Sequence, residues 1–92
     1  MKRINLKVKN EQGLHARPST KFVQITQKYE GDIKVIFNDE EVDAKNVMGL
    51  MLLAISKNDE FTVVANLDNE ISEKEVLDEL KYLVEVLKFN EI

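Results

Sequence analysis

The stretch Gly13-Leu14-His15-Ala16-Arg17-Pro18-Ser19 marks the point where an extended pattern gives way to a helical one. Before it, residues 4–8 alternate between apolar and polar, which is typical of a half-buried strand. After it, apolar residues from Ala16 to about Tyr29 recur at helical spacing. The stretch also holds the only histidine and the only proline of the chain, and its Gly13 is free to adopt a positive φ.

A helix that begins just after His15 creates a site for an anion. The backbone amides of Ala16 and Arg17 then have no acceptor within the helix, and Pro18 fits a first turn because its missing N–H would have stayed unpaired. Free amides and the positive end of the helix dipole attract negative charge, and the Arg17 guanidinium can bind two oxygens of one phosphate. We therefore predict that His15 accepts and holds a phosphoryl group, with His15 and Arg17 as the catalytic residues and Ala16, Arg17 and Pro18 as the phosphate-binding residues. From these residues alone, a capping or surface histidine with a chance arginine nearby remains an open alternative.

Composition limits the other possibilities. The 92 residues are expected to form a single domain, residues 1–92, and the absence of cysteine excludes disulfides and thiolate metal sites. One histidine cannot make a multi-histidine metal site, so no metal or cofactor is expected. The net charge of −4 argues against a general nucleic-acid binder, and no apolar run is long enough to enter a membrane, so we expect a cytoplasmic protein. Basic residues gather in residues 2–28, where an acidic partner could bind.

The remaining pattern predicts three further strands and two further helices. Residues 33–37 and 41–44 read as strands joined by a tight turn at Asn38-Asp39, and residues 60–65 read as a fourth strand. Gly31 is a candidate for the residue that ends the first helix in a left-handed conformation. For the last helix, Asp68-Asn69 and the S-x-x-E capping box that starts at Ser72 are rival starts. Its apolar face is expected to comprise Val76, Leu77, Leu80, Leu83, Val84 and Leu87. With one apolar stripe on each helix, the simplest packing is a single sheet with all helices on one face.

A short helix from Val47 to about Leu53, with Asn46 as its N-cap, is apolar on every side. Leu50 and Leu53 are expected to face the core, which leaves the methionines outside. Exposed methionine suits a surface that must fit several partners, because its unbranched side chain repacks easily. A more deeply buried helix is the open alternative. The predicted partner-binding residues are Thr20, Val47, Met48, Met51 and Leu52.

The motif G-L-H-A-R-P-S at residues 13–19, together with K-N-V-M-G-L-M at residues 45–51, resembles the histidine-containing phosphocarrier (HPr) family of the bacterial sugar phosphotransferase system. The resemblance covers essentially the whole chain. It implies an α+β open-faced sandwich of order βαββαβα, in which a four-stranded antiparallel sheet (order 1-4-2-3) carries three helices on one face.

The resemblance also implies a function. Phosphorylated Enzyme I would donate to His15, on the Nδ1 nitrogen that the family uses, and enzyme IIA-type proteins would then accept the group. The chain would be a monomeric carrier with transient partners, and it would not be an autonomous enzyme.

Several positions depart from the family pattern. Many relatives carry a regulatory serine that a kinase phosphorylates where this chain has Asn46, which has no hydroxyl. Gln12 differs from the residues usual before Gly13. Ala54 stands where glycine is common, and it is expected to add only a methyl group.

Two alternatives remain open. The chain could be a paralogue that serves a nitrogen or dihydroxyacetone branch, or a non-catalytic protein-binding module that uses the methionine-rich helix.

Overall fold

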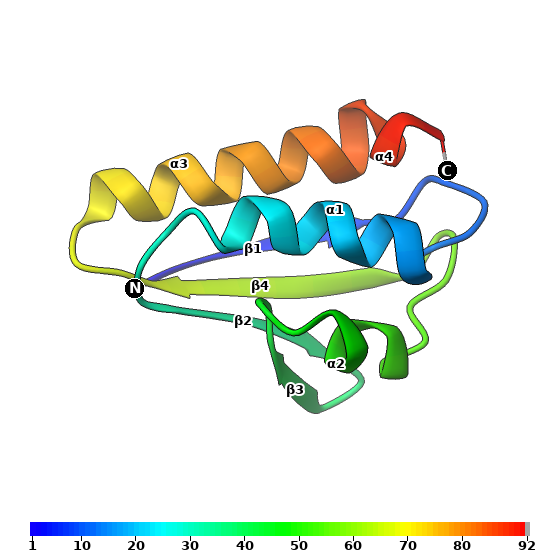
Figure 1. The fold of residues 1–92 in the computed structure, drawn as a ribbon, viewed down its shortest axis with the longest axis horizontal. Coiled ribbons are helices and arrows are strands. Elements are labelled where there is room, and N and C mark those ends of the chain that lie inside the picture. Colours follow the sequence, from blue (N-terminus) through cyan, green and yellow to red (C-terminus); the bar gives the residue numbers. More distant parts are fainter. Residues whose placement is uncertain (92) are drawn as a thin grey trace.

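Four antiparallel strands form one sheet in the order β1–β4–β2–β3, as expected (Figure 1). The computed structural model describes residues 1–91. In chain order its elements are β1 (Lys2–Lys7), α1 (Ala16–Thr26), β2 (Asp32–Phe37), β3 (Glu40–Asp43), α2 (Val47–Leu52), β4 (Glu60–Asn66), α3 (Glu70–Lys81), the π-helical turn η1 (Tyr82–Val86) and α4 (Lys88–Glu91). The central strand β4 pairs with β1 on one side and with β2 on the other.

The helices α1, α2 and α3 cover one face of this sheet, which gives the open-faced sandwich (Figure 1). Alternate residues of the strands point to that face and are fully or almost fully buried, among them Leu6, Ile33, Val35, Phe61 and Val63. This is the pattern that period-two alternation predicts for a sheet with one dry face. Within residues 1–91 no helix has the length and apolar character needed to cross a membrane.

Helix α1 ends at Thr26, three residues before the position we predicted. The Lys28 and Tyr29 amides donate to carbonyls three residues back, so the chain tightens into turns instead of continuing the helix. The Nζ of Lys45 donates hydrogen bonds to the carbonyl of Tyr29 at 2.6 Å and to that of Gly31 at 3.0 Å. Gly31 has a φ of +118° and lies beyond these turns, so it is not the left-handed cap that we predicted.

The turn between β2 and β3 places both Asn38 and Asp39 at positive φ, 51° and 65°. Positive φ at both central residues is the type I′ arrangement, which matches the twist of a hairpin. The start of α3 is also settled: the Asn69 side chain is the N-cap and accepts from the Ser72 amide at 2.8 Å. The capping box that would begin at Ser72 is therefore not formed.

The apolar face of the last helix is interrupted near its end. The turns of η1 contain an extra residue, which rotates the following side chains, and Leu87 is 37% exposed although we expected it in the core. Beyond it, Lys88, Phe89 and Asn90 all have positive φ, so α4 is a left-handed reversal. This reversal turns Phe89 inward, where it is fully buried.

Candidate functional site

His15 is the N-cap residue of α1, as the sequence predicts. Its backbone is extended, with φ −69° and ψ −168°, and its side chain makes no capping hydrogen bond. The side chain is exposed. The backbone of His15 alone therefore places the imidazole at the N-terminus of α1, and the ring is accessible to another protein.

The first turn of α1 presents unpaired amides next to this ring. The first amide that finds an acceptor within the helix is that of Ser19, which donates to the His15 carbonyl at 2.9 Å. Among residues 1–91 the Ala16 and Arg17 amides have no acceptor, and Pro18, which is buried, contributes no N–H. Together with the helix dipole, these two amides favour a negative charge in front of the helix.

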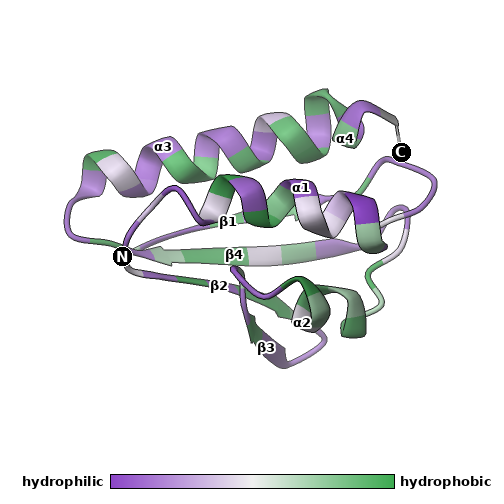
Figure 2. Ribbon diagram, in the orientation of Figure 1, coloured by the Kyte–Doolittle hydropathy of each residue, from purple (hydrophilic) through white to green (hydrophobic). Residues whose placement is uncertain are grey.

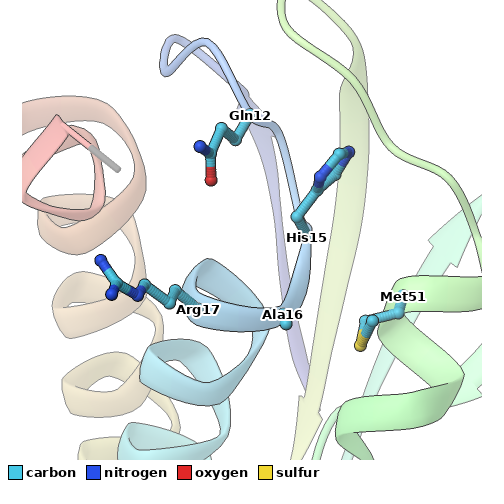
Figure 3. Close-up of a pocket in the computed structure, with 5 residues that line it drawn as sticks. All are labelled: Gln12, His15, Ala16, Arg17 and Met51. Atoms are coloured by element: carbon cyan, nitrogen blue, oxygen red, sulfur yellow. The ribbon is translucent and has the colours of Figure 1, made fainter.

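An open depression of about 540 Å³ lies at this point, lined by Gln12, His15, Ala16, Arg17 and Met51 (Figure 3). The depression brings together the loop before α1, the first turn of α1, and α2. We did not predict Gln12 as a site residue; it departs from the family pattern, which was the only signal in the sequence. Its amide can donate to an oxygen of an anion in the depression.

The Arg17 side chain lies along the flank of the depression and points away from the His15 ring (Figure 3). It is exposed, and no ion pair in residues 1–91 holds it there. The spacing in the sequence placed Arg17 beside the histidine but could not give this direction. A bidentate contact with a group on His15 requires a change of rotamer, which is fast for an exposed side chain.

Helix α2 forms an apolar surface beside the depression. Met48 is 62% exposed, Met51 36% and Leu52 76%, whereas Leu50 and Leu53 are buried as predicted. Figure 2 shows α2 as hydrophobic over most of its length, whereas hydrophobic and hydrophilic residues follow one another along α3. An exposed apolar patch next to an accessible histidine is typical of a surface that meets other proteins.

Two further predicted residues make local contacts. Thr20 is exposed, and its hydroxyl donates to the Ala16 carbonyl at 2.8 Å. The Asn46 side chain accepts from the Gly49 amide at 3.1 Å and so caps α2, as predicted. No cluster of histidine, cysteine or acidic side chains in the described part of the chain could hold a metal ion.

Comparisons with known proteins show which family the chain belongs to. The family model for the phosphorylation site of the HPr component of the phosphotransferase system (PTS) matches residues 2–86. A crystal structure of HPr from Thermoanaerobacter tengcongensis is 37% identical with a TM-score of 0.89, over 100% of this chain and 99% of that one. The phosphocarrier protein HPr of Bacillus anthracis is 29% identical with a TM-score of 0.79, over 91% and 96%.

The catabolite repression protein Crh of Bacillus subtilis, crystallised as a domain-swapped dimer, is 32% identical with a TM-score of 0.69, over 100% and 98%. The matched model spans nearly the whole chain, and the strand order and helix placement are those that the HPr resemblance implies. This chain therefore belongs to the HPr family, the phosphocarrier proteins of the phosphotransferase system.

Proposed function

We propose that His15 is the phosphoryl acceptor of this carrier, that phosphorylated Enzyme I is the donor, and that sugar-specific enzyme II components receive the group. The observation that carries the proposal is the exposed imidazole at the N-cap of α1, next to the unpaired amides of Ala16 and Arg17. These amides can bind phosphoryl oxygens without closing around them, because the depression is open to solvent.

The transfer exchanges one nitrogen–phosphorus bond for another. A neutral nitrogen of His15 attacks the phosphorus of the donor's phosphohistidine, the new N–P bond forms as the old one breaks, and the donor imidazole leaves with its electron pair. Nothing is oxidised or reduced, and no water is consumed. The Ala16 and Arg17 amides and the Arg17 guanidinium face the negative oxygens during the exchange. In the second transfer the enzyme II component attacks the phosphorus on His15, and the His15 imidazole is the group that leaves.

The direct test is incubation with Enzyme I and phosphoenolpyruvate, followed by intact-mass analysis. We expect an acid-labile gain of one phosphoryl group, which the His15→Ala variant does not show. The exposed ring packs into no core, so this variant should keep its thermal stability. Transfer through the alanine variant would reject His15 as the acceptor.

Arg17→Lys tests the guanidinium separately. A lysine keeps the charge but cannot make two parallel hydrogen bonds to one phosphoryl group, so transfer should slow by about tenfold. Lys21→Arg, one turn along the same helix, is the matched control and should leave the rate unchanged. Equal rates for Arg17→Lys and the wild type would exclude a bidentate role.

The surface formed by Met48, Met51, Leu52 and Val47 is proposed to dock the partners, with Thr20 at its margin. A charge in its centre, as in Met48→Lys, should raise the KM of Enzyme I for the carrier by about tenfold, because a desolvated lysine opposes binding. Ile71→Lys is the control, because Ile71 is 73% exposed on α3. The docking proposal is rejected if the two variants have the same KM.

We further propose that this carrier lacks the regulatory serine switch, because Asn46 has no hydroxyl to phosphorylate. Incubation with ATP and the kinase that modifies this serine in relatives should leave the mass unchanged. An Asn46→Ser variant keeps a capping oxygen and supplies the hydroxyl, so it is the positive control. A stable phosphate on the unaltered chain would refute this proposal.

A monomeric state is also proposed. The Lys7 amide on the outer edge of β1 donates to Glu85 Oε2 at 2.9 Å, which occupies an edge group that could pair with a second chain. Sedimentation should give a mass close to 10.6 kDa at all concentrations tested. A dimer, such as the swapped one of Crh, would contradict the proposal.

A further inference from the structure

Two buried side chains hold the backbone immediately before the α1 helix. Ser19 is fully buried, and its hydroxyl donates to the Leu14 carbonyl at 2.7 Å. Its amide donates to the next carbonyl, that of His15, at 2.9 Å. One residue inside the helix therefore holds two successive peptide groups on either side of the His15 Cα.

Asn10 holds the preceding peptide in the same way. It is 3% exposed, and its Nδ2 donates to the Gly13 carbonyl at 3.0 Å. The other end of that peptide group, the Leu14 amide, donates to the Ile55 carbonyl at 3.0 Å. The peptide between Gly13 and Leu14 is thus fixed at both its oxygen and its N–H.

The two Ser19 contacts set the directions of the His15 and Ala16 amides. In a trans peptide the C=O and the N–H of one plane point in opposite directions. Because the Leu14 carbonyl points inward to Ser19, the His15 amide points outward. Because the His15 carbonyl is directed along the helix, the Ala16 amide points away from it. In residues 1–91 neither amide has an acceptor.

We infer that Ser19 is a positioning residue, which orients the His15 and Ala16 amides for the phosphoryl group before it arrives, and that Asn10 supports it by fixing the preceding peptide. The inference rests on the proposed function of His15. Neither side chain touches the transferred group; each acts through the backbone, so that no reorganisation is needed when charge arrives.

A purely structural role would predict a different result. Any buried hydroxyl needs a partner, and losing that hydrogen bond lowers stability wherever it lies. Thr26 offers the comparison, because it is fully buried at the other end of α1 and its hydroxyl donates to the Ala44 carbonyl at 2.8 Å. Ser19→Ala and Thr26→Val each delete one such hydrogen bond, and both should lower the Tm.

The two variants should differ in phosphoryl transfer from Enzyme I. At saturating carrier, Ser19→Ala should lower kcat by about tenfold, because a misaligned amide loses transition-state stabilisation, while KM stays unchanged. Asn10→Ala should lower kcat in the same direction. Thr26→Val should leave both constants at the wild-type values. The inference is overturned if Ser19→Ala has the wild-type kcat, or if Thr26→Val loses as much.

A second measurement does not depend on Enzyme I. Phosphoramidate phosphorylates imidazole directly, and in the wild type the amide protons of His15 and Ala16 should then shift downfield in the NMR spectrum as they donate to phosphoryl oxygens. The shifts should be clearly smaller in Ser19→Ala and unchanged in Thr26→Val. Equal shifts in all three proteins would overturn the inference.

The two arms separate the possible failures. If Enzyme I fails to phosphorylate the wild type while the amide shifts still differ as stated, the proposed function fails and the positioning role stands. If Enzyme I phosphorylates the wild type and Ser19→Ala behaves like Thr26→Val in both arms, the function stands and the positioning role fails.

Discussion

Replacing Ala54 by glycine should stabilise this protein, although it removes a side-chain atom. Ala54 directly follows the C-cap residue Leu53 of α2, and its φ is +57°. This is the left-handed conformation in which many helices end, usually with glycine. For alanine it costs about 1–2 kcal/mol, because the Cβ approaches the backbone too closely. We had expected only an added methyl group; the structure shows that the penalty lies in the backbone.

The net gain follows from two opposing effects. Ala54→Gly relieves the left-handed strain, but glycine gives the unfolded chain about 0.4–1 kcal/mol more conformational freedom to lose. The side chain is exposed, so no packing is lost. The balance is a stabilisation of about 0.5–1 kcal/mol, which corresponds to a rise in Tm of about 2–8 °C for a domain of this size.

Thermal unfolding followed by circular dichroism measures this shift, and urea unfolding checks it. Asn58→Gly is the matched control: Asn58 has a φ of +75°, and asparagine tolerates the left-handed region better than alanine. The control should therefore gain less than Ala54→Gly. If Ala54→Gly has an unchanged or lower Tm, the strain argument is wrong.

Three other predictions concern one core side chain and two titratable side chains. Phe89→Ala should lower the free energy of unfolding by about 3 kcal/mol in urea titrations, because the ring is fully buried, and a loss well under that figure would show that the reversal is not part of the core. The Leu67 amide, which donates to Glu73, holds the pKa of that carboxyl below its ordinary value of 4.5 against the opposing effect of burial. The resulting stability is present above that value and is lost as the pH falls through the lowered pKa, so Glu73→Gln should flatten this part of the acid unfolding curve; an unchanged curve would contradict the assignment. Burial and the hydrogen bond to Glu79 raise the pKa of Tyr29 to about 12, so the phenolate absorbance of a variant with Tyr29 as its only tyrosine should appear near that pH and not near the ordinary 10.

The fold was largely predictable because local pattern and tertiary structure agree. Alternation located all four strands, and the N-cap residues His15 and Asn46 located the starts of two helices. The strand order came from the family resemblance, since period-two alternation says which face is buried and not which strand is the neighbour. Here β4 inserts between β1 and β2, which are closer in sequence to each other.

The misses share a physical cause, which is tertiary contact overriding a local rule. Helix α1 ends at Thr26, whose hydroxyl donates to the Ala44 carbonyl, and the Lys45 Nζ donates to two of the carbonyls that follow. For the last helix the sequence left two starts open, at Asp68-Asn69 and at the S-x-x-E pattern from Ser72, and the structure shows Asn69 as the cap, while the Glu73 carboxylate accepts from the Leu67 amide before the helix. At the C-terminal end of the last helix, a strict 3.6-residue period cannot show the extra residue in η1. It therefore could not predict that Leu87 turns outward and Phe89 inward.

Gly13 shows how the segment before His15 is held against the segment that follows α2. The sequence leaves Gly13 free to adopt a positive φ, and the structure has +62°. The structure adds a second requirement: a Cβ at this position would lie 2.3 Å from the Ile55 carbonyl oxygen, which is too close for any side chain. That same carbonyl accepts from the Leu14 amide, so the segment after α2 packs directly on the segment before His15. A partner that binds Met48 and its neighbours, as proposed, would therefore meet the His15 backbone in a fixed position, and Ala54, at positive φ, is part of the short connection between α2 and this contact.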